Sequence, residues 1–171
     1  RQVINFVMPG DFMGLQAGLM KEMQHSAEAV TSMTLCVFDR KELWTLFKQS
    51  PELAYDLTWL AALEEHFLGT GLTALGQCSA EEKMAWALLR FFTRCQAVGL
   101  AKGDTCPFPY RQQDLADALG LSLVHTNKTL KKLSRQQILT VSDGHMRIAD
   151  QERLHRLAVI EVEAPGTRPL I

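Results

Sequence analysis

The stretch YRQQDLADALGLSLVHTNKTLKKLSR, residues 110–135, decides the fold of this chain. Its spacing predicts two short helices joined by a tight turn at Gly120, because glycine can adopt the positive φ that such a corner needs. The apolar face of the first helix is formed by Leu115, Ala116 and Leu119. Ser122 is the expected N-cap of the second helix. The inner face of the second helix is formed at helical spacing by Thr126, Thr129, Leu130 and Leu133.

The second helix keeps an outer face that is mostly polar or basic. This face consists of Leu123, Val124, His125, Asn127, Lys128, Lys131, Lys132 and Arg135. Residues 111–135 contain five Lys or Arg and two Asp, which leaves a charge of +3 inside a chain of net charge −1. A compact helix pair with a basic outer face is what entry into the major groove of DNA requires. From this stretch alone, the alternative is a helical hairpin whose lysines are merely solvated.

The residues that follow favour DNA binding over that alternative. Ile138–Ile148 contains a short β-type run, the pair Asp143-Gly144 suited to a two-residue hairpin turn, and a second short run. Two helices followed by a hairpin form a winged helix, whose wing lies along the sugar–phosphate backbone. His145 and Arg147 are the wing residues expected to make such contacts.

Length and composition indicate a globular protein. The 171 residues, 47% hydrophobic and 22% charged, leave room for one large domain or two small ones. No apolar run approaches the roughly 20 residues of a membrane span and no signal peptide is evident, so the cytoplasm is the expected compartment. The four cysteines lack Cys-x2-Cys spacing, so no zinc site is expected. No nucleophile motif and no Gly-rich phosphate loop is found, so we do not expect an enzyme.

The first forty residues favour β-structure. Val3–Val7 meets the turn signal Pro9-Gly10-Asp11, and Ala29–Phe38 is a longer strand candidate rich in β-branched residues. Two or three strands without a sheet partner do not form a stable core alone. Since the chain also opens on Arg1 rather than Met, we expect a fragment whose remaining strands precede residue 1.

A long helix is predicted from Pro51, because Ser50 suits an N-cap and proline suits the first helical turn. An apolar stripe follows at spacings of four, three, three and four residues: Leu53, Leu57, Leu60, Leu63 and Phe67. The stripe indicates pairing with the same helix of a second subunit, and the alternative is packing on the helix's own domain. Gly69 and Gly71 are expected to fray or bend the helix near its end.

The rest of the chain completes a three-part order. The capping box Ser79-x-x-Glu82 starts a helix to about Gln96. Residues 98–109 are expected to form a loop, and residues 150–159 a short closing helix. The predicted domains are the C-terminal part of a β domain (1–50), a dimerisation helix with its hinge (51–77), a winged helix (78–160) and a loose tail (161–171).

This order resembles the Crp–Fnr family of bacterial transcription regulators. The resemblance rests on Pro9-Gly10-Asp11-Phe12 with Gly14, on residues 78–83 (CSAEEK), and on Gln113-Asp114-Leu115-Ala116 followed by residues 119–122 (LGLS). It covers nearly the whole chain to about residue 160, and the helix-turn-helix match is its most specific part. The implied fold is α+β: part of a cyclic-nucleotide-binding-like β-roll (a double-stranded β-helix), a long dimerisation helix and a C-terminal winged helix-turn-helix.

The resemblance also implies a function. Family members are homodimers that bind palindromic double-stranded DNA, with RNA polymerase as a further partner. The base-contacting positions fall at Leu123, Val124 and Lys128, where the best-known members carry Arg, Glu and Arg, so the half-site should differ from the usual one. The other expected DNA contacts are Arg111, Gln112, Ser122, His125, Asn127, Lys131, Lys132, Arg135 and Arg147. A winged helix that contacts another protein without specific DNA binding is the alternative.

Arg111 departs from the family pattern, because a capping Ser or Thr is commoner at its position. The change removes a cap on the order of 1 kcal/mol. We expect a phosphate contact to offset it.

The resemblance does not extend to the ligand residues of cyclic-nucleotide binders. Those proteins use a Gly-Glu pair for the ribose and an Arg-Ser pair for the cyclic phosphate. Here Gly14 is followed by Leu15, and the phosphate region is MQHSA at residues 23–27. A buried phosphate without a guanidinium is costly, so cyclic AMP is not the expected effector. An iron–sulfur cluster or a haem stays open, since the cysteines that hold a cluster in Fnr-type members mostly precede the β-roll.

Overall fold

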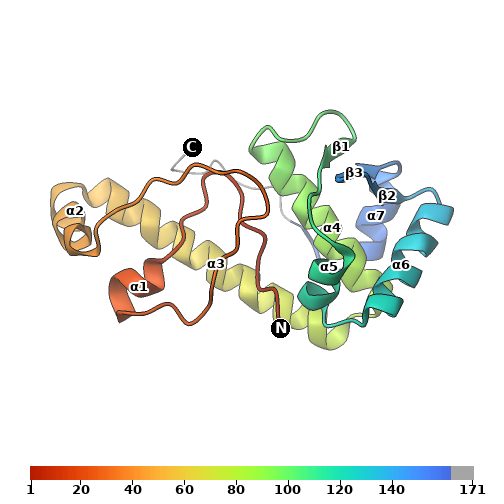
Figure 1. Cartoon of the computed structure of the whole chain (residues 1–171), viewed down its shortest axis with the longest axis horizontal. Helices are drawn as coiled ribbons and strands as arrows, with labels where there is room; N and C mark the ends of the chain where they lie inside the picture. Colours follow the sequence, from red (N-terminus) through yellow and green to blue (C-terminus); the bar gives the residue numbers. More distant parts are fainter. Residues whose placement is uncertain (163–171) are drawn as a thin grey trace.

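A long helix, α3 (Pro51–Gln77), connects the two ends of the molecule in the computed structural model, which describes residues 1–162 (Figure 1). Its 27 residues extend about 40 Å at the usual rise per residue. Pro51 occupies the first turn as predicted, and Ser50 is the N-cap residue although its hydroxyl makes no capping hydrogen bond. No helix of the described residues is both long enough and apolar enough to cross a membrane.

The fraying predicted at Gly69 and Gly71 is wrong, because α3 continues through both glycines to Gln77. Each glycine costs about 1 kcal/mol in a helix interior. Packing on either side offsets that cost: the ring of Phe67 stacks on Trp86 with 6.3 Å between ring centroids, and Ala74 is fully buried. Tertiary contacts therefore override the local preference.

Residues 1–50 differ from the sequence prediction. They contain the short helices α1 (Leu15–Met20) and α2 (Leu43–Gln49) and the 3-10 turn η1 (Arg40–Glu42), and no β-strand. The strands predicted at Val3–Val7 and Ala29–Phe38 do not form, because a strand needs a neighbour to pair its backbone groups. The assignment of residues 1–50 to a β-roll domain stays a prediction.

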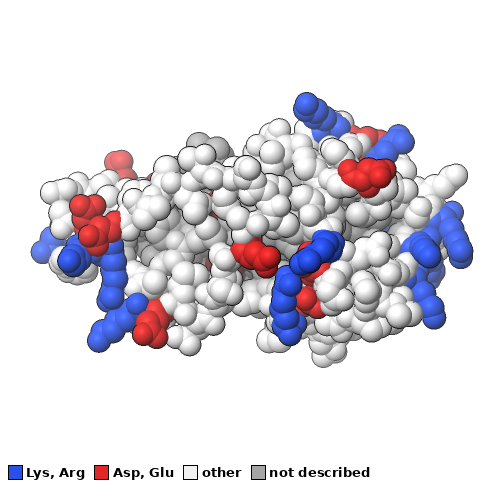
Figure 2. All heavy atoms as spheres, in the orientation of Figure 1, with Lys and Arg blue, Asp and Glu red and all other residues white. Residues whose placement is uncertain are grey.

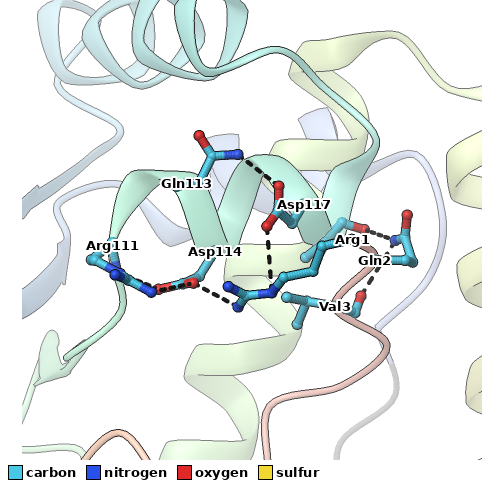
Figure 3. A network of polar contacts seen from close by, with 8 residues as sticks. Arg1, Gln2, Val3, Arg111, Gln113, Asp114 and Asp117 are labelled. Carbon is cyan, nitrogen blue, oxygen red and sulfur yellow. Dashed lines mark hydrogen bonds and ion pairs between the residues drawn. The ribbon is translucent and has the colours of Figure 1, made fainter. Parts of the chain in front are cut away.

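The first eleven residues instead lie along α4 (Ala80–Ala97) and α5 (Gln112–Leu119). The Arg1 guanidinium reaches the Asp114 carboxylate at 2.8 Å (Figure 3). The Val3 backbone N–H donates to the Asp117 carbonyl oxygen at 3.3 Å. The Phe6 ring lies 4.4 Å from that of Tyr110, centroid to centroid. Arg94 of α4 donates to the Phe6 carbonyl oxygen at 2.9 Å. Hydrogen bonds with α4 and α5 thus pair backbone groups of this segment that a neighbouring strand would otherwise pair.

The C-terminal half is a winged helix, which confirms the predicted α+β fold class for this part of the chain. Its elements after α4 and α5 are α6 (Leu123–Arg135), the strands β1 (Thr105–Pro107), β2 (Leu139–Ser142) and β3 (His145–Ile148), and α7 (Gln151–Ala158). The capping box is present: the Ser79 backbone N–H donates to the Glu82 carboxylate at 2.7 Å. The closing helix predicted at 150–159 is confirmed as α7. Most of the predicted tail, residues 163–171, lies outside the described residues.

The three strands form an antiparallel sheet of order β1-β3-β2. Asp143 and Gly144 both have positive φ, 52° and 71°, which is the turn geometry that the Asp-Gly pair predicted. β1 is missing from the sequence prediction, which placed a loop there. Because β1 is an edge strand, Pro107 is tolerated at its end.

Candidate nucleic-acid interface

α6 is fixed on its inner side by the core. Thr126, Thr129, Leu130 and Leu133 are at most 8% exposed, as the helical spacing predicts. The Ser122 hydroxyl accepts the His125 backbone N–H at 3.2 Å, which confirms Ser122 as the N-cap. Gly120 takes φ 61° at the corner between α5 and α6. The side chains on the outer face of α6 therefore have a defined direction.

The outer face of α6 is exposed and cationic. Its basic face, which we define as Lys128, Lys131, Lys132 and Arg135, is exposed throughout, and α6 carries no Asp or Glu. Figure 2 shows these blue side chains gathered at the edge of the molecule that α6 forms in Figure 1. In the first turn, Leu123 is 41% exposed and Val124 is 65% exposed. His125 is exposed beside them.

Three of the predicted DNA-binding cations, Arg111, Lys132 and Arg147, already have acidic partners. The Lys132 ammonium lies 2.5 Å from the Glu81 carboxylate of α4, and Arg147 Nε on the wing lies 2.7 Å from the Asp104 carboxylate. The hydrogen bond from Arg147 holds the pKa of Asp104 below its ordinary value. A phosphate must compete with these carboxylates. Among the residues that the structure describes, Lys128, Lys131 and Arg135 make no ion pair.

Glu81 and Asp104 are the site residues that sequence reasoning missed. They stand 51 and 43 residues from their basic partners. No helical or strand period connects positions so far apart, so only the fold brings them together.

Asn127 does not lie on the outer face in the way the sequence predicted. It is half-buried, and its Oδ1 is buried without a hydrogen-bond partner among the described residues. The side-chain amide oxygen of Asn127 therefore does not reach the surface that the other outer-face residues form. A helical position between the inner and outer faces can take either direction, and here packing decides it.

Arg111 is the N-cap residue of α5 and Gln112 is its first residue. Both are exposed, but the Arg111 side chain already pairs with Asp114. The Arg111 backbone N–H donates to Asp114 Oδ2 at 2.9 Å, and its Nε donates to the same oxygen at 3.3 Å (Figure 3). Asp114 thus accepts the backbone N–H of the N-cap residue but does not replace a hydroxyl that would accept a helix N–H. The phosphate contact expected of Arg111 stays a prediction, and it requires the guanidinium to leave Asp114. Burial by itself raises the pKa of the Asp114 carboxyl, but hydrogen bonds from Arg111 and Arg1 outweigh it, and the pKa lies below its ordinary value.

We expect Asp114→Ala to lower the free energy of unfolding by about 1.5–3 kcal/mol at pH 7, the usual range for hydrogen bonds to a charged group. Because the folded pKa of Asp114 is depressed, its contribution is present above the unfolded pKa of about 4 and is lost as the pH falls through the folded value. Denaturant melts of both proteins should therefore converge below pH 4. Asp104→Ala is the control, since the ion pair of Asp104 is exposed to solvent and an exposed pair contributes little to stability. A gap that stays constant with pH would contradict this assignment.

The apolar stripe predicted on α3 faces the chain itself at several positions. Leu57 and Leu60 are only 3% and 8% exposed, and Phe67 stacks on Trp86 beneath the Arg90 guanidinium, which lies 3.8 Å from the ring centroid. These residues match the alternative of packing on the helix's own domain. Leu53 is half-buried and Leu63 is 37% exposed. The dimer contact at this stripe stays a prediction that the buried members do not favour.

The described residues contain no group of three or more His, Cys, Asp or Glu placed to hold a metal ion. The outer face of α6 offers cations and apolar side chains to a ligand. That chemistry suits a polyanion with apolar groups between its charges.

Known proteins match both the winged helix and most of the rest of the chain. Residues 82–157 match the Crp-like helix-turn-helix domain. The nitrogen fixation regulation protein FixK of Bradyrhizobium diazoefficiens is 33% identical over 158 residues, and the transcriptional activatory protein AadR of Rhodopseudomonas palustris is 31% identical over 159 residues. Each alignment covers 92% of this chain and 65% of the relative. The chain thus spans slightly less than two thirds of each relative's length.

Solved structures show the same fold. FixK2 from Bradyrhizobium japonicum superimposes with a TM-score of 0.62 at 27% identity, covering 69% of this chain and 58% of that one. A CooA mutant from Carboxydothermus hydrogenoformans gives a TM-score of 0.56 at 14% identity, covering 70% of this chain and 55% of that one. The second likeness is one of fold alone.

Proposed function

Because this chain belongs to the Crp–Fnr family of bacterial transcription regulators, we propose that it binds a palindromic double-stranded DNA site as a homodimer and thereby regulates transcription. The observation that carries the proposal is α6, a helix with a buried inner face and an outer face of four cations without a carboxylate. Its relatives are regulators rather than enzymes. The proposal places the protein in the cytoplasm with the chromosome, and RNA polymerase is its expected partner there.

In this proposal α6 enters the major groove and the wing follows the backbone. The N-terminal residues of a recognition helix contact base edges, so Leu123, Val124 and Lys128 face the bases. Lys131 and Arg135 lie further along the same side of the helix and reach phosphates. Arg147 reaches phosphate from the wing once it leaves Asp104. We do not expect residues 1–50 to sense cyclic AMP, because Leu15 follows Gly14 and no Arg-Ser pair is present at residues 23–27.

Lys128→Ala should weaken binding to the cognate site by about 1–3 kcal/mol, because Lys128 can donate to guanine O6 or N7. Binding to unrelated DNA should change much less. Titrations of both duplexes by fluorescence anisotropy measure the two affinities. An equal loss on both would make Lys128 a phosphate contact instead.

The dimer contact is proposed on the outer side of α3. The residues of this seam recur at alternating spacings of three and four and are all exposed: Tyr55, Thr58, Ala62, Glu65, Gly69, Leu72 and Gly76. This spacing is that of a helix seam that faces a partner helix. A Cβ built on Gly69 or Gly76 meets no atom within 4 Å, so both glycines leave open room for a second helix to approach.

Leu72→Glu should therefore split the dimer while leaving the fold intact, since Leu72 is 74% exposed. Sedimentation velocity at micromolar concentration measures the dissociation. Leu60→Glu is the matched comparison, because Leu60 is 8% exposed and a charge there should unfold the chain rather than only separate subunits. A Leu72→Glu protein that stays dimeric would place the interface elsewhere.

A further inference from the structure

The first turn of α6 has an unusual chemistry for a surface that meets base edges. Its two most N-terminal side chains, Leu123 and Val124, are apolar and 41% and 65% exposed. The Ser122 hydroxyl already accepts a hydrogen bond as the N-cap, and the side-chain amide oxygen of Asn127 is buried. The part of α6 that enters the groove first therefore presents two apolar side chains, with the exposed imidazole of His125 beside them.

The major groove offers an apolar side chain one preferred partner. Thymine carries a 5-methyl group there beside its O4 acceptor, whereas adenine, guanine and cytosine carry hydrogen-bond donors or acceptors and no methyl group. An apolar side chain against such a polar edge removes water without replacing its hydrogen bonds, which is unfavourable. The discrimination therefore has two sources, a favourable apolar contact at thymine and a desolvation cost at the other bases.

We infer that Leu123 and Val124 recognise thymine by its 5-methyl group at adjacent base positions in each half-site. The inference rests on the proposed function and specifies the ligand of the same helix. Neighbouring helix residues point about 100° apart, so the two side chains reach different base steps. Val124 lies one turn before Lys128 on the same side, which places the methyl-contacting position beside the one that donates hydrogen bonds.

The test uses duplexes that differ by a single methyl group. Once the preferred site is known, each thymine of the half-site is replaced symmetrically by deoxyuridine, and the dissociation constant of the intact dimer is measured. Burying one methyl group is worth about a fourfold change in affinity, so one or two positions should lose about fourfold per half-site. A second matched pair is cytosine against 5-methylcytosine at those positions, where the methylated base should bind about fourfold more tightly.

Protein variants assign the effect to the two side chains. The double variant Leu123→Ala/Val124→Ala should bring the uridine-to-thymidine ratio of dissociation constants close to one. Lys128→Ala should weaken binding yet keep that ratio. Ratios near one at every thymine in the wild-type protein, together with a clear preferred sequence, would overturn the methyl inference and leave the proposed function standing. Absence of any preferred sequence would overturn both.

Discussion

Leu133→Ala is expected to lower the free energy of unfolding by about 2–5 kcal/mol, the range for a large-to-small change in a core that cannot collapse around the cavity. Leu133 is fully buried and belongs to the core cluster that includes Phe92 of α4 and Leu139 of β2. It is therefore a main anchor of α6 on the rest of the winged helix. Equilibrium unfolding in urea, followed by circular dichroism, measures the change.

The matched control lies on the same helix. Leu123→Ala removes the same atoms from a side chain that is 41% exposed, so its effect on stability should be far smaller. Its effect on DNA binding should be the larger of its two effects. If both variants lost the same stability, the division of α6 into a buried inner face and a free outer face would be wrong.

Neutralising Lys128, Lys131 and Arg135 together to glutamine should flatten the salt dependence of DNA binding. Each phosphate contact contributes a slope of about −0.9 to the plot of log affinity against log salt. Because the homodimer carries each residue twice, losing Lys131 and Arg135 as phosphate contacts should reduce the magnitude of the slope by about 3.6. The reduction would be larger, about 5.4, if Lys128 also contacted phosphate. Binding titrations at salt concentrations between about 50 and about 400 mM measure this slope.

A charge-matched control is available at the other end of the molecule. Lys21, Lys41 and Lys48 are exposed and lie outside the winged helix. Replacing these three by glutamine removes the same charge and should leave the slope nearly unchanged. An equal effect of both triple variants would mean that net charge, rather than the face of α6, governs binding.

The winged helix could be predicted because its signals are local. Helical spacing places Thr126 and Leu133 inward, Ser122 caps α6, and Asp143-Gly144 makes the hairpin turn. Each feature depends on residues within a few positions of one another. The same holds for the capping box at Ser79 and for Pro51 at the start of α3.

The features that the sequence did not predict depend on contacts between residues far apart in the chain. Val3–Val7 has the composition of a strand but no neighbour to pair with, so it packs on helices instead. β1 exists only because β3 offers it an edge. The ion pairs Lys132–Glu81 and Arg147–Asp104, and the burial of Leu57 and Leu60, likewise follow from packing between elements, which a single sequence does not reveal.

The central claim is that this chain recognises a DNA sequence through α6. Selection from a random pool of DNA duplexes with the intact dimer, performed at two salt concentrations, tests it most directly. We predict a palindromic motif that persists as the salt concentration rises, with thymine in each half-site. Salt-sensitive binding without any motif, or no binding at either salt concentration, would contradict the claim and would favour a winged helix that contacts protein.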